Sequence, residues 1–395
     1  MKSTARPLLA AAAAAFLLNA AVPPPALAHD REQEIRRGAR NVIFMVPDGM
    51  GLADVTAARI FKNGIDGAPL HFETLDHIGY QRTYSSNSTI TDSAPAASAW
   101  ACGEKFNNGE ICFHADGRPH LPSILELAKR TGRSTGMVAT STITHATPAA
   151  FGAHVVNRNC ETEIARQYIE VTRPDVLLGG GAAKFKPAKP DACGAMGDYV
   201  SEAEQSGYTI VRTRQEMKEG AAAGAWKVLG LFTPEVMTPE VLRTAGSTEP
   251  RLPEMTVAAL DILERSGKGF FLMVEGSQVD WANHANDLPY QIGETLAFDE
   301  AVKTVLDWIH ANPERREHTL LIVSPDHETG GFAINGPGNR LLRAREYVAA
   351  GWTTRDHTGT DVPVWAQGPG SAAVGRALNN TDLYKVMKQA LKADD

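Results

Sequence analysis

The 395-residue sequence predicts an α/β fold in which a mostly parallel sheet carries helices on both faces. Two observations lead to this prediction. Short, nearly continuous apolar runs alternate with longer amphipathic stretches, as expected when strands are buried on both faces. Reactive side chains follow directly after several of these runs, and ligands of parallel sheets bind beyond the carboxyl ends of the strands. The sequence contains no evident linker, so we expect one catalytic domain over residues 29–395.

The apolar runs and amphipathic stretches give the expected elements in chain order. The predicted strands are Val42–Val46, Thr135–Ala139, Val176–Leu178, Val228–Phe232, Phe270–Val274, Thr319–Ser324 and Val362–Gln367. The predicted helices are Ala53–Lys62, Ser93–Cys102, Ser123–Arg130, Glu161–Ile169, Pro253–Arg265, Gln291–His310 and Asp382–Leu391. Thr381 is a candidate N-cap of the last helix.

Residues 1–28 have the pattern of a secretory signal peptide. A basic start precedes an Ala-rich apolar run from Leu8 to Val22, and Ala26-Leu27-Ala28 matches a cleavage site. The apolar run is short for a membrane span, although an N-terminal anchor is the alternative. The sequence therefore predicts a mature protein without a membrane span, located in the periplasm or secreted.

The formal net charge of the chain is −7, and loss of the basic leader would make the mature protein more acidic. A nucleic-acid-binding protein would need a basic stripe, so this charge argues against nucleic acid as a ligand. An acidic protein that acts on an anionic substrate needs local positive charge at its site, and metal ions can supply it.

The four cysteines predict two disulfides if the protein is exported. Three pairings are possible. We favour Cys102–Cys112 and Cys160–Cys193, because each bond then closes the nearer loop. The alternative, a cysteine-based zinc site, is disfavoured because the spacings fit no zinc-finger pattern.

Two short motifs carry side chains that zinc accepts as ligands. Asp280 and His284 stand four residues apart, which on a helix places them on one face and one turn apart. Asp326 and His327 follow an apolar run and Pro325, where a strand ends and adjacent side chains can converge. Each motif is weak alone, because a solvated helix face and a polar loop start are the ordinary alternatives.

Two further candidate ligands lie in loops beside predicted strands. Asp48 follows the first strand in a turn that Gly49 and Gly51 make possible, and His357 precedes the last strand. The alternatives are an Asx turn at Asp48 and an unliganded loop position for His357. Neither position predicts a metal site without the other motifs.

Ser93 is the candidate nucleophile. It precedes Ala94-Pro95 at the start of a predicted helix, where backbone N–H groups and the helix dipole suit an anion. A plain N-cap is the commonest role for such a serine. The sequence has no G-x-S-x-G elbow, which disfavours a hydrolase triad. A serine without a paired base needs other activation, and coordination by a metal ion can supply it.

Six motifs in this order resemble those of the alkaline phosphatase family, over roughly residues 41–392. They are Asp48-Gly49-Met50-Gly51, Thr91-Asp92-Ser93-Ala94, the segment from His145-Ala146-Thr147-Pro148-Ala149 to Arg158, the segment from Val274-Glu275-Gly276 to His284, Asp326-His327, and His357-Thr358-Gly359. The resemblance implies a three-layer α/β/α sandwich around a large, mostly parallel sheet, and a homodimer.

The resemblance also implies two zinc ions and one magnesium ion. Its ligand sets are Asp280, His284 and His357 for one zinc, Asp48, Asp326 and His327 for the second, and Asp48, Thr147 and Glu275 for magnesium. Ser93 is then the nucleophile, and Arg158 holds two phosphate oxygens with its planar guanidinium. Two such zinc ions can clamp the attacking and leaving oxygens of an in-line displacement.

The chain departs from the best-known bacterial pattern at two positions. His145 stands where many bacterial members have Asp, and Trp281 where many have Lys. His145 either binds the third metal, which would favour zinc there, or orients water, and Trp281 removes a cation or packs in the core. We place His145, Trp281 and Asp92 around the metals or substrate. Residues 335–354 form a candidate surface insertion near the site.

These observations predict an enzyme that hydrolyses phosphate monoesters of small molecules through a phosphoserine, with an alkaline optimum. A phosphodiesterase or another specialised member of the superfamily is the first alternative, but it would need room for a second ester group. A noncatalytic phosphate- or metal-binding protein is the second, and it would not need Ser93 in its full motif.

Overall fold

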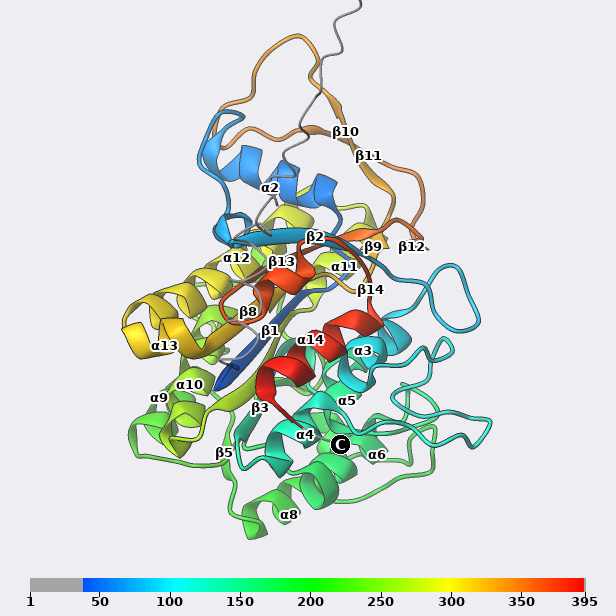
Figure 1. The fold of residues 1–395 in the computed structure, drawn as a ribbon, viewed down its shortest axis with the longest axis vertical. Helices are drawn as coiled ribbons and strands as arrows, with labels where there is room; N and C mark the ends of the chain where they lie inside the picture. Colours follow the sequence, from blue (N-terminus) through cyan, green and yellow to red (C-terminus); the bar gives the residue numbers. More distant parts are fainter. Residues whose placement is uncertain (1–37, 394–395) are drawn as a thin grey trace, which may run out of the picture.

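The computed structural model describes residues 38–393, and its centre is a sheet of ten strands (Figure 1). The strand order is β14-β2-β13-β8-β1-β7-β3-β4-β6-β5. Their bounds are β1 Asn41–Pro47, β2 His77–Arg82, β3 Ser134–Thr142, β4 Val176–Gly180, β5 Thr209–Val211, β6 Val228–Leu231, β7 Phe270–Gly276, β8 Thr319–Val323, β13 Val362–Gln367 and β14 Ala377–Asn379. All neighbours pair in parallel except β13, which is antiparallel to both β2 and β8. The predicted mostly parallel sheet is confirmed.

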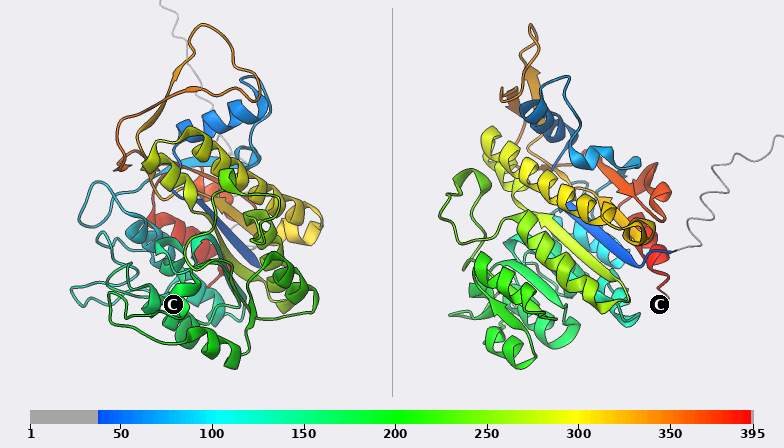
Figure 2. Two further views of the ribbon diagram at one scale, coloured as in Figure 1. Left: turned by 180° about the vertical axis from the view of Figure 1, so that it is seen from behind. Right: turned by 90° about the vertical axis from the view of Figure 1, so that its left-hand side faces the viewer.

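Helices cover both faces of the sheet, which gives three layers (Figure 2). Alternate residues of a strand point to opposite faces. In β1, Val42 and Phe44 pack with residues of the first helix layer, whereas Ile43 and Met45 pack with residues of the second. The first layer includes α3 (Ser93–Cys102), α4 (Ile124–Arg130), α5 (Ala146–Gly152), α6 (Glu161–Gln167) and α14 (Thr381–Leu391), and the second includes α9 (Arg214–Ala222), α10 (Leu252–Leu263) and α12 (Leu288–His310).

The remaining helices are shorter or lie at the upper edge of the sheet (Figure 1). They are α2 (Leu52–Asn63), α7 (Ala182–Phe185), α8 (Tyr199–Gln205), α11 (Gln278–Ala285) and α13 (Pro313–His318). A hairpin of β10 (Phe332–Gly336) and β11 (Ala349–Trp352) lies beside α2 and packs on it through a small apolar cluster. The predicted insertion at 335–354 falls on this hairpin and the loop that joins its strands.

Each predicted strand and helix is present, but several of their ends were wrong. Glu161–Ile169 is a helix only to Gln167, after which a π-helical turn follows. Asn380 precedes the last helix as its N-cap, so the predicted cap Thr381 is instead the first helical residue. Ser123 caps its helix through a hydrogen bond to the Glu126 N–H and therefore lies outside it. Such ends depend on hydrogen bonds that periodicity does not reveal.

Both favoured disulfides are present, Cys102–Cys112 and Cys160–Cys193. The predicted signal peptide, residues 1–28, lies outside the described residues. Between residues 38 and 393, no helix is both long and apolar enough to cross a membrane.

Glu294 in α12 is a buried carboxyl group whose ionisation opposes folding. Burial raises its pKa from 4.5 to about 8, so the folded protein keeps a proton that the unfolded chain releases. Stability therefore falls by about 1.4 kcal/mol per pH unit as the pH rises between these two pKa values, and stays low above them.

The variant Glu294→Gln retains an acceptor for the Glu240 N–H, which donates to Glu294 over 2.6 Å. We expect it to raise the melting temperature at about pH 9 and to leave it nearly unchanged at about pH 4.5. Calorimetry at both pH values checks this, and a melting temperature that does not rise at pH 9 would contradict it.

Candidate active site

Three buried carboxylates meet where β1, β7 and β8 end. Asp48 directly follows β1, Glu275 is the penultimate residue of β7, and Asp326 lies three residues beyond β8. The two outer strands both pair in parallel with β1, so their carboxyl ends share one edge of the sheet. All three side chains are fully buried, which is costly for carboxylates without a compensating cation.

A first group of potential metal ligands consists of Asp280, His284 and His357. Helix α11 places Asp280 and His284 one turn apart, with Nε2 of His284 3.3 Å from Oδ2 of Asp280. Nε2 of His357 lies 3.5 Å from Oδ1 of Asp280 and 3.2 Å from Nε2 of His284. The hydrogen bond with Asp280 raises the pKa of His284 to about 9. The structure thus brings these three predicted ligands together.

A second group surrounds His327. Its Nε2 lies 3.0 Å from Oδ2 of Asp326 and 3.7 Å from Oδ1 of Asp48. Asp280 is also within reach of the ligand atoms of Asp48 and His327, so it lies between the two groups. The Gly49 N–H donates to Oδ1 of Asp326, which leaves its other oxygen turned to His327. Burial and the neighbouring carboxylates, Asp326 first, raise the pKa of Asp48.

A third group lies on the other side of Asp48, with Glu275, His145 and Thr147 near it. Within residues 38–393, neither oxygen of Asp48 has a hydrogen-bond partner, and Oε1 of Glu275, Oγ1 of Thr147 and Nδ1 of His145 also have none. Buried polar atoms without partners are rare and point to a missing ion or water.

These donors fit metal ions. The first two groups offer the imidazole and carboxylate ligands that zinc accepts, and the third offers carboxylate and hydroxyl oxygens that suit magnesium. The orphaned oxygens of Asp48 face both the second and the third group. A cation in each place would satisfy them and offset their mutual repulsion.

Ser93 is the first residue of α3 and lies beside the second group. Its Oγ is 3.2 Å from Nε2 of His327. The N-cap of α3 is Asp92, whose carboxylate accepts a hydrogen bond of 2.7 Å from the Ala94 N–H, so the alternative that Ser93 caps the helix is wrong. The hydroxyl of Ser93 therefore does not cap the helix, and it faces His327 at the helix N-terminus.

Arg158 joins this cluster from a distant loop. Its Nη1 donates to Oδ1 of Asp92 over 3.1 Å, and its Nη2 lies 3.2 Å from Nε2 of His145. Burial, followed by the charge of Arg158, lowers the pKa of His145 to about 3, which keeps its imidazole neutral and its lone pair available.

Trp281 is only partly buried and meets the His145 ring edge to face, with the ring centroids 5.9 Å apart. It therefore lines the site rather than filling the core.

Thr329 is a site residue that the sequence did not reveal. Its hydroxyl donates to Oδ1 of Asp280 over 2.5 Å and lies 3.2 Å from Nδ1 of His327. It thus connects the first and second groups. Its proximity to Asp326-His327 in the chain was the available signal, but a threonine near a motif is too common to be informative.

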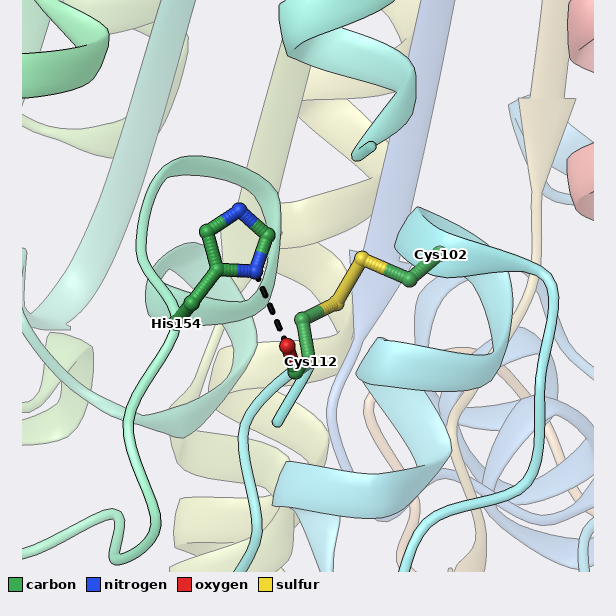
Figure 3. Close-up of side chains that lie close together, drawn as sticks. All are labelled: Cys102, Cys112 and His154. Atoms are coloured by element: carbon green, nitrogen blue, oxygen red, sulfur yellow. Dashed lines mark hydrogen bonds between the residues drawn. A yellow bond between two sulfur atoms is a disulfide. The ribbon is translucent and has the colours of Figure 1, made fainter. Parts of the chain in front are cut away.

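Figure 3 shows the disulfide Cys102–Cys112, which connects the helix that begins with Ser93 to the segment that pairs with the Arg158 loop. Cys102 is the last residue of α3, which begins with Ser93. The segment next to Cys112 pairs with the Arg158 loop, because Ile111 bridges to Val155 and the Arg158 N–H donates to the Gly109 carbonyl over 2.8 Å. His154 lies against the same bond, and its Nδ1 is 2.9 Å from the Cys112 carbonyl oxygen. Cys102, Cys112 and His154 resemble a metal site in spacing, but the disulfide consumes both thiols.

A family model described as alkaline phosphatase matches residues 39–350 and 339–393. The chain belongs to the alkaline phosphatase family. It is 34% identical to alkaline phosphatase 4 of Bacillus subtilis, over 89% of either chain. It is 35% identical to streptomycin-6-phosphate phosphatase of Streptomyces griseus, over 93% of this chain and 94% of the relative.

Solved structures of alkaline phosphatases share this fold. The enzyme of the Antarctic bacterium TAB5 is 33% identical, with a TM-score of 0.78 over 91% of this chain and 99% of that chain. A variant of the TAB5 enzyme, in which a histidine is replaced by glutamate, has Mg bound in its M3 site. The resemblance inferred from the motifs is confirmed, and with it a phosphatase that acts on phosphate monoesters.

Proposed function

We propose that the chain converts phosphate monoesters of small molecules to an alcohol and inorganic phosphate through a phosphoserine at Ser93. The observation that carries the proposal is the convergence of the Ser93 hydroxyl, the Arg158 guanidinium and three groups of potential metal ligands, the buried members of which include oxygens without hydrogen-bond partners in the described residues. A binding protein would need the positive charge but not the serine.

The proposed metal content is two zinc ions and one magnesium ion. Asp280, His284 and His357 would hold one zinc, Asp48, Asp326 and His327 the second, and Asp48, Thr147 and Glu275 the magnesium. Bound there, the ions would supply Lewis acidity that lowers the pKa of a hydroxyl or water and neutralises a departing oxygen. His145 lies within ligand distance of the third group and is neutral, which supports zinc as an alternative occupant of that site.

The protein's own groups would then carry out two displacements. The Ser93 oxygen forms a bond to phosphorus as the ester oxygen departs in line and takes up a proton. Arg158 pairs with two nonbridging oxygens and stabilises the charge that they carry, while Asp92 holds the guanidinium in place. Water next attacks the phosphoserine, which releases phosphate and restores the Ser93 hydroxyl.

Hydrolysis of p-nitrophenyl phosphate by the purified protein with zinc and magnesium present tests this function. We expect turnover that increases from about pH 7 toward the alkaline range, since deprotonated hydroxyl groups are the attacking species. Absence of p-nitrophenol release at every pH between 7 and 11 would refute the proposal.

Arg158→Ala is expected to weaken binding of phosphate far more than it lowers stability. The substitution removes two charge-assisted hydrogen bonds, worth about 1.5–3 kcal/mol each, to the substrate. The KM for p-nitrophenyl phosphate and the inhibition constant of phosphate should both rise by about 10²–10⁴-fold, because each 1.4 kcal/mol is a factor of about ten. Arg118→Ala removes an exposed arginine that pairs with Asp116, and it serves as the control. Equal constants for both variants would contradict the assigned role.

We further propose that the protein acts outside the cytoplasm, as a homodimer. Both cysteine pairs are oxidised, which is the usual state in the periplasm or outside the cell. The basic leader-like start of the sequence supports the same location. The family supports the dimer, and sedimentation of the purified protein measures it.

A further inference from the structure

A polar cavity of about 720 Å³ borders the candidate active site. Residues 82–89, which run from β2 toward Ser93, form most of its wall, and Lys105, Gly359 and Asp361 complete it. The wall is close to the first metal group. Thr89 and Gly359 belong to the wall, and each lies two residues from a member of one contact: the Thr91 carbonyl oxygen is 2.9 Å from Nδ1 of His357. A group bound in this cavity could therefore belong to the same molecule as a phosphate at Ser93.

The cavity carries uncompensated positive charge. Arg82 and Lys105 both line it, and in the described part of the chain neither forms an ion pair with a carboxylate. Lys105 instead donates to the Tyr84 carbonyl and lies 3.7 Å from the centroid of the Tyr84 ring. Burial, followed by the nearby charge of Arg82, lowers the pKa of Lys105 to about 7, so the free amine loses its charge in the alkaline range and an anion bound beside it would raise that pKa and restore the charge.

The acidic member of the wall, Asp361, is exposed and forms no ion pair among residues 38–393. One carboxylate is too few for a cation site, which takes several oxygen ligands. The charge balance of the wall therefore favours an anion.

Hydroxyl groups complete the lining. Thr83 is only 2% exposed, yet its Oγ1 has no hydrogen-bond partner in residues 38–393. Ser86 and Thr89 add two exposed hydroxyls to the wall. A buried hydroxyl without a partner is costly unless a ligand or water satisfies it. Cations surrounded by hydroxyl donors suit a tetrahedral oxyanion, because each of its oxygens can accept several hydrogen bonds.

We propose that this cavity binds a second phosphate group of the same substrate, so that small molecules with two phosphate groups are the preferred substrate class. The inference rests on the proposed phosphatase function, since the first phosphate must react at Ser93. Binding of the second group lowers the entropic cost of placing the first one, because the two events become intramolecular.

A series of alkanediol bisphosphates with three to nine carbons tests the proposal, with the corresponding monophosphates as references. For the native protein we expect the ratio of kcat/KM, bisphosphate to monophosphate, to reach about 10 or more at one spacer length, through a lower KM. The double variant Arg82→Gln with Lys105→Gln should lower this ratio to about 2, the statistical value for two equivalent ends, while hydrolysis of monophosphates is unchanged. Lys189→Gln, an exposed lysine elsewhere, is the control and should retain the preference.

The outcomes separate this inference from the proposed function. If no monophosphate is hydrolysed, the proposed function fails. If monophosphates are hydrolysed but the ratio is about 2 at every length, or if the double variant retains the preference, the cavity is not a substrate site. Chemical acetylation of Lys105, measured by mass spectrometry with and without inorganic phosphate, shows whether the anion of the cavity is free phosphate or a phosphate group of the substrate. Inorganic phosphate that protects Lys105 from acetylation, together with a kcat/KM ratio of bisphosphate to monophosphate of about 2, would overturn the substrate assignment. Free phosphate would then be the ligand of the cavity.

Discussion

Ser93→Ala is expected to lower kcat for p-nitrophenyl phosphate by about 10³-fold or more, which is at least roughly 4 kcal/mol of transition-state stabilisation. The reason is that Oγ of Ser93 is the atom proposed to bond to phosphorus. Alanine is compatible with the first turn of α3, and Asp92 still caps that helix. The variant should therefore fold as the native protein does and retain the proposed zinc ions.

Kinetics beside metal analysis of the same preparation check this expectation. Ser201→Ala, in the first turn of α8, is a matched control for a serine-to-alanine change near a helix start. Turnover that survives largely intact in Ser93→Ala would refute the covalent mechanism. Loss of zinc together with turnover would instead show that Ser93 supports the metal site.

Removal of the metal ions should abolish activity and also weaken the fold. Asp48, Glu275 and Asp326 are fully buried, and several of their oxygens have no hydrogen-bond partner in the described residues. Without cations these carboxylates repel one another and the phosphate of the substrate. We expect chelation to lower the free energy of unfolding by about 3–5 kcal/mol, the usual cost of leaving buried charge unpaired.

Calorimetry before and after chelation, with the metal content measured, provides a readout that does not depend on turnover. The same experiment on Ser93→Ala should show the same loss of stability, because that variant retains the ligands. Zinc and magnesium added back should restore both melting temperature and activity. A metal-free protein with an unchanged melting temperature would contradict the assigned ligands.

The sequence predicted the central fold because parallel strands are buried on both faces. β1, β7 and β8 are nearly continuous apolar runs, and this is the pattern expected of strands with both faces covered by helices. β2 escaped prediction because its residues are exposed or partly exposed except for Gln81, which is polar, and because its first half has no apolar run. β5 and β14 have three residues each, too few for a periodic pattern.

The candidate ligands followed from motifs, but their arrangement did not. Asp280 and His284 share a helix face, so their proximity was predictable from spacing. That Asp280 also reaches the group around His327, and that His145 meets Arg158, depends on contacts between distant segments. Thr329 was missed for the same reason, since its partner Asp280 is 49 residues away.

The disulfide between Cys102 and Cys112 makes the candidate active site differ before and after oxidation of the cysteines. Before the cysteines are oxidised, the end of the helix that presents Ser93 is held against the segment that carries the Arg158 loop by hydrogen bonds and packing, without the covalent link between sulfur atoms. In a reducing cytoplasm, a newly made chain would thus hold the proposed nucleophile and the proposed phosphate-binding arginine less firmly than the oxidised protein. The protein would then hydrolyse phosphate esters inside the producing cell slowly, and it would reach full activity only after disulfide formation outside the cytoplasm.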